Sequence, residues 1–137
     1  MAQPSADQIA RVPLFAGLER RELERIANSF KERRVTAGSP IASEGQSGAG
    51  FFIITDGTAK VTVGGNERAS LGPGDYFGEI ALIDAGTRSA TITAETDMTC
   101  YGLTQWEFRP IVESESRIAW KLLQALAQKL RAAEQRS

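Results

Sequence analysis

Turn-forming residues recur at short intervals through the middle of this 137-residue chain. They cluster at Ala37-Gly38-Ser39-Pro40, Asp56-Gly57, Gly64-Gly65-Asn66 and Leu71-Gly72-Pro73-Gly74. Gly, Pro, Asn and Asp favour tight reversals of the backbone. Turns this close together are typical of an antiparallel barrel or roll, so the middle of the chain is predicted to be all β.

Apolar and β-branched residues fill the short segments between the turns, and this is the composition that strands prefer. We predict strands at Arg34 to Thr36, Phe51 to Thr55, Thr58 to Val63, Ala69 to Leu71, Thr91 to Ala94 and Met98 to Leu103.

Helical periodicity replaces this pattern toward the N-terminus. The apolar residues Leu23, Ile26, Ala27 and Phe30 recur at helical spacing between charged residues, which predicts an amphipathic helix over Glu19 to Phe30. A shorter apolar stretch precedes it, and Pro13 with Gly17 breaks the chain between the two pieces. A helical hairpin is therefore expected.

The C-terminal part is also predicted to be helical. Gln105 to Val112 is expected to form a short helix with a break near Pro110, and Trp106 is expected to pack that helix against the roll. From Ser116 to Arg136 a strong helical pattern carries a heptad-like seam of Ala119, Leu123, Leu126, Leu130 and Ala133. Ile118 and Leu122 widen this apolar face, so two interpretations stay open. The helix either packs on the core or pairs with a second copy through the seam.

These patterns predict one α+β domain over residues 1–137. An N-terminal helical segment (1–30) precedes an antiparallel β-roll of jelly-roll type (31–103), and C-terminal helices follow (104–137).

Composition excludes several classes of function. No apolar run is long enough to span a membrane and the first seven residues lack the features of a secretory signal, so a cytoplasmic protein is expected. A net charge of −1 without a long basic run argues against direct binding of nucleic acid. The absence of histidine removes the commonest metal ligand and general base, so neither a metal site nor an enzyme is expected. The single cysteine, Cys100, is interpreted as a buried structural residue.

One segment, from Pro73 to Thr91, departs from the strand pattern. Gly78 allows close backbone approach, and Glu79 to Ile83 suit a single helical turn whose free amides can bind an anion. Arg88 adds a planar set of donors suited to phosphate oxygens, Ser89 adds a hydroxyl, and Glu79 suits a ribose hydroxyl. A structural interpretation also exists, in which Gly78 only turns the chain and Glu79 pairs with Arg88.

The sequence here resembles the cyclic nucleotide-binding domains of the bacterial catabolite activator protein, protein kinase regulatory subunits and cyclic nucleotide-gated channels. The resemblance rests on Phe77-Gly78-Glu79-Ile80-Ala81-Leu82 followed by Arg88-Ser89-Ala90, at the spacing of the family's phosphate-binding cassette (77–90). It extends to Val12 to Leu18 and to Phe51 to Gly57. It implies a roll of about eight strands with helices on each side.

The resemblance also implies roles for individual residues. The backbone amides of Gly78, Ile80 and Ala81 would face the phosphate, together with Arg88, Ser89 and the backbone of Ala90. Glu79 would bind the ribose 2′-hydroxyl. Trp120 and Gln124 on the last helix are candidate lid residues over the base.

No cofactor is expected beyond the ligand. In the family that the sequence resembles, a threonine directly after the cassette arginine tends to accompany a preference for cGMP, so the resemblance with Ser89 at this position implies cAMP over cGMP. The seam of Ala119, Leu123, Leu126 and Leu130 is a candidate homodimer contact. No helix-turn-helix follows the last helix, so the chain is expected to be a stand-alone sensor or a regulatory piece of a longer protein. The alternatives are a roll without ligand that serves as an interaction or dimerisation module, and a metal enzyme of the cupin type, which the lack of histidine disfavours.

Overall fold

The structure is a computed structural model that describes residues 3–43, 45, 50–84, 86, 88 and 90–136. In these residues, strands form two four-stranded sheets with the orders β1-β8-β3-β6 and β2-β7-β4-β5, and every pairing is antiparallel. The first sheet contains β1 (Lys31–Val35), β3 (Gly50–Asp56), β6 (Tyr76–Phe77) and β8 (Met98–Thr104). The second contains β2 (Pro40–Ala42), β4 (Ala59–Val63), β5 (Asn66–Leu71) and β7 (Thr91–Ala94).

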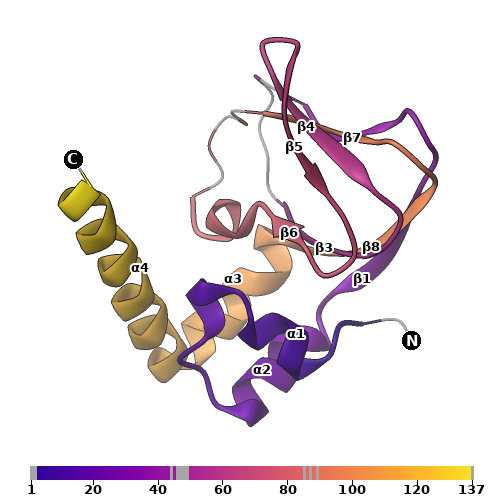
Figure 1. Cartoon of the computed structure of the whole chain (residues 1–137). Helices are drawn as coiled ribbons and strands as arrows, with labels where there is room; N and C mark the ends of the chain where they lie inside the picture. The colour runs from indigo at the N-terminus through magenta and orange to yellow at the C-terminus, as the bar shows by residue number, and fades with distance from the viewer. Residues whose placement is uncertain are drawn as a thin grey trace.

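The helices lie on one side of this roll (Figure 1). They are α1 (Ala6–Ala10), η1 (Pro13–Phe15), α2 (Arg20–Ala27), η2 (Glu79–Leu82), α3 (Gln105–Ser114) and α4 (Ser116–Arg136), where η denotes a 3₁₀ helix. The predicted α+β roll of eight strands with N- and C-terminal helices is confirmed, but the helices gather on one side of the roll and not on each side. The two sheets do not close into a barrel.

Strand β3 separates two hydrophobic clusters because its side chains alternate between its two faces. Phe52 and Ile54 point between the sheets, where they pack with Ile92 and Cys100. Phe51 points to the helical side, where its ring lies 5.8 Å from that of Phe15, 5.7 Å from that of Phe30 and 6.0 Å from that of Tyr76. The roll and its helical cover are thus joined through one central strand. Cys100 is buried as predicted, and burial raises the pKa of its thiol.

Helices α2 and α3 begin at capping boxes. In α2, the Glu22 side chain accepts a hydrogen bond from the backbone N–H of Glu19. In α3, the Glu107 side chain accepts one from the backbone N–H of Thr104. This arrangement satisfies amides that a helix start leaves unpaired.

Two expectations for α3 were wrong. The helix runs through Pro110 without a break, and Trp106 is 75% exposed rather than packed on the roll. Proline removes the hydrogen bond to the carbonyl four residues earlier, which belongs to Trp106. Both residues lie on the exposed side of the helix, so water can reach that carbonyl.

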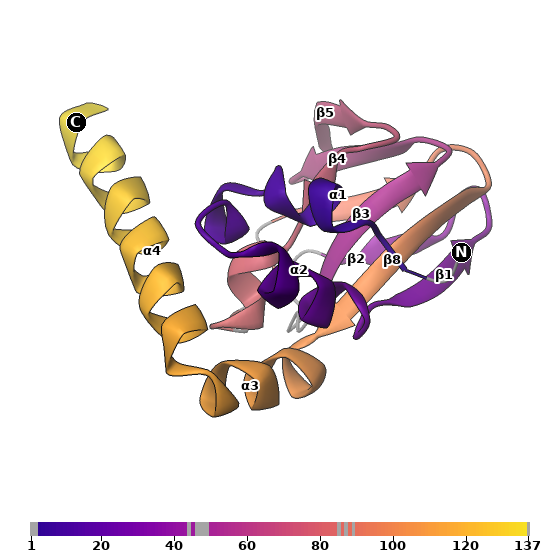
Figure 2. The same ribbon diagram turned by 90° about the horizontal axis from the view of Figure 1, so that it is seen from below.

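Helix α4 leaves the body of the domain at an angle, and both views show its C-terminal half standing away from the roll (Figures 1 and 2). Its first turns pack on the core through Ile118 and Leu122, whereas Leu123 and Leu130 are exposed. The core-facing interpretation therefore holds for the first half of the helix. In the described residues, none of the helices has the length and hydropathy to cross a membrane.

Candidate functional site

The site begins where β6 ends and the chain reverses. Gly78 has a φ of 87° and caps η2, a conformation in which side chains other than glycine are strained. A Cβ atom at this position would lie 2.4 Å from the carbonyl oxygen of Gly50. The turn before η2 therefore requires glycine for its conformation and for the close approach of β3.

Arg88 lies against this turn. Its Nη2 donates to the Gly50 carbonyl oxygen at 2.8 Å, and its Nη1 lies 2.9 Å from the place that a Cβ on Gly78 would occupy. Burial lowers the pKa of Arg88, because the surrounding protein favours the charged form less than water does. Among the described residues, the partner recorded for this guanidinium is a carbonyl and not a carboxylate. The result is a half-buried cation with donors available to an anion.

The other predicted site residues follow Gly78 along η2. Glu79 is half-buried, and burial together with the charge of Glu79 raises the pKa of Tyr76. The backbone N–H of Ala81 donates to the Gly78 carbonyl oxygen at 3.1 Å, so the helical turn uses this amide internally. The Ile80 side chain is exposed.

The structure brings Gly78 and Arg88 together, and their role in binding a phosphate stays a prediction. Ala90 is half-buried immediately before β7, and Ser89 lies outside the described residues. Gly50 is the contact that sequence reasoning missed. It acts through a backbone carbonyl, which every residue carries, so no side-chain pattern could have marked it. In the described part of the chain, no group of three or more candidate metal ligands is found.

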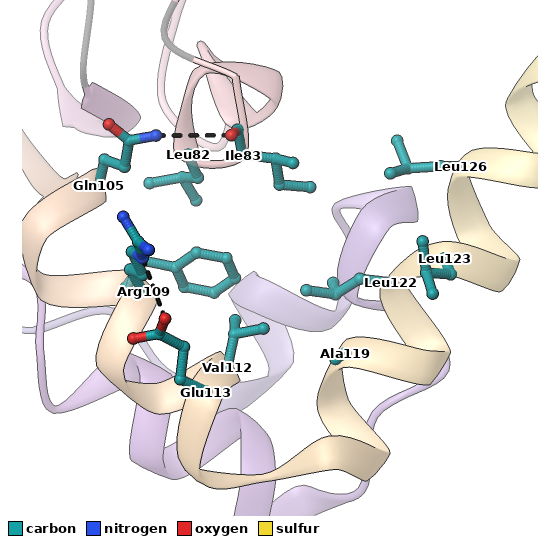
Figure 3. A pocket seen from close by; sticks show the side chains of 11 residues that line it. Leu82, Ile83, Gln105, Arg109, Val112, Glu113, Ala119, Leu122, Leu123 and Leu126 are labelled. Atoms are coloured by element: carbon teal, nitrogen blue, oxygen red, sulfur yellow. Dashed lines mark hydrogen bonds and ion pairs between the residues drawn. The ribbon is translucent and has the colours of Figure 1, made fainter.

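An apolar groove of about 380 Å³ lies between η2, α3 and α4 (Figure 3). On one side Leu82 ends η2 and Ile83 follows it, and on the other side Leu123 and Leu126 belong to α4. The Gln105 side-chain amide donates to the Ile83 carbonyl oxygen at 3.4 Å and ties α3 to the end of η2. The segment that follows Gly78 and the last helix thus face each other across an apolar gap.

The two candidate lid residues lie elsewhere on α4. Trp120 is 61% exposed, and Gln124 lines a shallow pocket with Pro13 and Gly17 on the side of η1. In this arrangement neither residue lines the groove beside η2. Their role over a base stays a prediction.

Comparisons with known proteins agree with this geometry. A family model described as the cyclic nucleotide-binding domain matches residues 32–115. A "Cyclic AMP receptor protein" of Thermus thermophilus is 33% identical over 127 residues, which are 89% of this chain and 59% of that protein. A "cGMP-dependent protein kinase" of Toxoplasma gondii is 40% identical over 95 residues, 69% of this chain and 10% of the kinase.

A solved structure is similar over almost the whole chain. It is the N-terminal domain of a transcriptional regulator from Streptomyces coelicolor A3(2), with a TM-score of 0.86 and 30% identity, and the match covers 96% of this chain and 94% of that one. The chain therefore spans 59% of the receptor and 10% of the kinase named above, but nearly all of this isolated domain.

Proposed function

This chain belongs to the cyclic nucleotide-binding domain family, and from this premise we propose that it is a non-catalytic cytoplasmic sensor that binds cAMP in preference to cGMP. The observation that carries the proposal is the half-buried Arg88 guanidinium, which a backbone carbonyl holds beside the Gly78 turn. A desolvated cation with a neutral partner favours an incoming anion, because attraction to the anion replaces the favourable hydration that the cation lost when it was buried.

The cyclic phosphate would lie between Arg88 and the start of η2. Arg88 offers a planar set of donors that suits two phosphate oxygens, and its bond to Gly50 fixes the orientation of that plane. The backbone amides of Gly78, Ile80 and Ala81 and the hydroxyl of Ser89 are proposed to add donors, with the Ala81 amide leaving its bond to Gly78. The backbone of Ala90 completes the proposed contacts.

Glu79 is proposed to accept a hydrogen bond from the ribose 2′-hydroxyl. The choice of base rests on Ser89, which stands directly after the arginine, where members of the family that prefer cGMP tend to have threonine. The Thermus relative is named for cyclic AMP and the Toxoplasma kinase for cGMP, so the names of relatives support both bases. We favour cAMP.

Binding is proposed to draw α4 toward η2. Leu123 and Leu126 face Leu82 and Ile83 across the groove, and closing this gap would remove apolar surface from water. Trp120 and Gln124 are proposed as lid residues after a rotation of the helix. The ligand can drive this movement only by binding the closed arrangement more tightly than the open one.

Calorimetric titration tests the proposal directly. We expect cAMP to bind most tightly, cGMP more weakly and 5′-AMP much more weakly than either, since an open dianionic phosphate does not suit a site built for a monoanionic ring. The protein should first be unfolded and refolded to remove any nucleotide carried through purification. Absence of heat with all three nucleotides would refute the sensor function and leave a roll that only binds other proteins.

We propose that the exposed C-terminal half of α4 binds the same half of a second copy of this chain. Leu130 is 63% exposed and shares the seam with Leu123 and Ala133. Leu130→Glu should weaken self-association about thirtyfold, since each copy loses roughly 1 kcal/mol of apolar burial. Sedimentation equilibrium measures this change. Ala132→Glu places the same charge off the seam and is the control, and a monomeric wild type at all concentrations would exclude the dimer.

A further inference from the structure

Glu115 is the residue that joins α3 to α4. It leaves the helical conformation, with φ −133° and ψ 97°, yet its N–H still donates to the Ile111 carbonyl oxygen at 3.2 Å. Its own carbonyl accepts from Ile118 at 3.1 Å in the first turn of α4. The backbone of Glu115 therefore ends one helix and starts the next, and its conformation sets the angle between them.

Helix α2 contacts this joint through its arginines. The guanidinium of Arg25 donates to the Glu115 carboxylate and, at 2.9 Å, to the Ser114 hydroxyl. Arg21 donates to the same carboxylate at 3.5 Å. The side chain of Glu115 is only 20% exposed, so water screens this cluster less than an ordinary surface pair.

A further contact joins α2 to the first turn of α4, just after the joint. Arg117 donates to Glu22 at 2.5 Å, and the Glu22 side chain is fully buried. We call the six residues Arg21, Glu22, Arg25, Ser114, Glu115 and Arg117 the α2 clamp. All of its contacts lie between α2 and the residues at or next to the joint.

We propose that the α2 clamp is an autoinhibitory latch, which holds α4 away from η2 and so opposes binding of the nucleotide. This inference rests on the proposed function of the roll. With the clamp formed, α4 stands off the roll and the groove beside η2 stays open (Figures 2 and 3). When α4 moves toward η2 as a rigid helix, the chain turns at Glu115, and we infer that this turn pulls its carboxylate away from Arg21 and Arg25.

The clamp is also built to open. Arg21 is 70% exposed and Arg25 41%, so water can solvate both arginines when the contacts break. The Oε2 atom of Glu22 is buried without a hydrogen-bond partner among the described residues. Separating this fully buried carboxylate from Arg117 would leave a buried charge unpaired, so the Arg117–Glu22 contact stays formed and the contacts that open are those of Glu115 with Arg21 and Arg25. The latch therefore opposes closure by a modest amount that a ligand can overcome.

The test is the variant Glu115→Gln, which removes the charge at the joint and keeps the side-chain shape. The apparent dissociation constant of a two-state domain is the intrinsic constant divided by the fraction in the binding-competent state. Loss of two partly screened ion pairs should raise that fraction and tighten cAMP binding about three- to tenfold. Arg25→Gln breaks the clamp from the α2 side and should act in the same direction.

The matched control is Glu24→Gln. Glu24 lies on α2 and pairs with Arg20 at 3.5 Å, so this variant makes the same charge change without touching the joint. Its affinity should equal that of the wild type. Equal or weaker binding by a folded Glu115→Gln protein would overturn the latch.

A measurement without nucleotide separates this inference from the proposed function. Spin labels attached through Asp84→Cys, just after η2, and Lys129→Cys on α4 report the width of the gap. The distance should shorten in Glu115→Gln and stay unchanged in Glu24→Gln. If the wild type binds no nucleotide, the proposed function fails, and the label distance still decides whether the clamp positions α4. An unchanged distance in Glu115→Gln refutes it.

Discussion

Replacing Arg88 with alanine is expected to weaken cAMP binding by roughly thirtyfold to several thousandfold while the roll stays folded. Truncating one partner of a buried, hydrogen-bonded charge pair costs about 2–5 kcal/mol, and every 1.4 kcal/mol is about tenfold in affinity. Arg88→Lys should fall between wild type and alanine, because lysine restores the charge without the planar fork. Calorimetric titration of the three proteins measures the order.

The stability of Arg88→Ala is the control for this prediction. In the described residues the side chain donates to the Gly50 carbonyl and its charge is partly desolvated. Removing it costs the folded protein one hydrogen bond and relieves the cost of desolvating a half-buried cation. We expect the melting temperature to change by about 5 °C or less. An early-unfolding variant that binds cAMP as well as wild type would show that Arg88 belongs to the scaffold and not to the site.

Replacing Gly78 with alanine is expected to damage both binding and folding. The new Cβ would lie 2.4 Å from the Gly50 oxygen and 2.9 Å from Arg88 Nη1, at a φ of 87°. A left-handed conformation costs an L-residue about 1–2 kcal/mol, and a forced shift of packed backbone adds about 1–3 kcal/mol. The shift falls on the carbonyl that orients Arg88, so cAMP affinity should drop by about a hundredfold or more.

Gly74→Ala separates the two causes. Gly74 has a φ of 92°, but apart from its chain neighbours no heavy atom of the described residues lies within 4 Å of the added Cβ. This variant should show the conformational cost in a denaturation experiment and keep its affinity for cAMP. If Gly74→Ala lost affinity as strongly as Gly78→Ala, the close approach of Gly50 to the turn would not be the cause.

The sequence predicted the strands that carry apolar or β-branched runs and missed the shortest ones. Thr91–Ala94 matches its prediction residue by residue, and Met98–Thr104 exceeds its prediction by one residue. Strands β2 and β6 went unrecognised because three and two residues are too few to show a period. The pairing of β6 with β3 is a tertiary effect, in which Phe77 stacks on Phe52 with ring centroids 5.2 Å apart.

The helices, like the strands, were predicted best where a periodic pattern runs over many residues. Ser116–Arg136 was predicted to the residue because its periodicity runs over many turns. The single-residue joint at Glu115 has no sequence signal of its own, and Pro110 suggested a break where the helix continues. Whether a proline breaks a helix depends on solvent access to the freed carbonyl, and local sequence does not determine that access.

For the site, residue types identified Gly78 and Arg88, since a left-handed turn and a planar cation each need a particular side chain. The part played by Gly50 depends on where β3 passes the turn, which only the fold decides. The α2 clamp was equally invisible, because its partners are about 90 residues apart in the chain.

The positions of Trp106 and Trp120 have an optical consequence. They are the two tryptophans of the chain, and they lie on α3 and α4, on either side of the joint at Glu115, while the roll contains none. Both indoles are largely exposed, so their emission depends on the water and charged groups around these two helices. Intrinsic fluorescence excited at the tryptophan band therefore reports on the surroundings of α3 and α4 and carries no signal from a tryptophan in the roll.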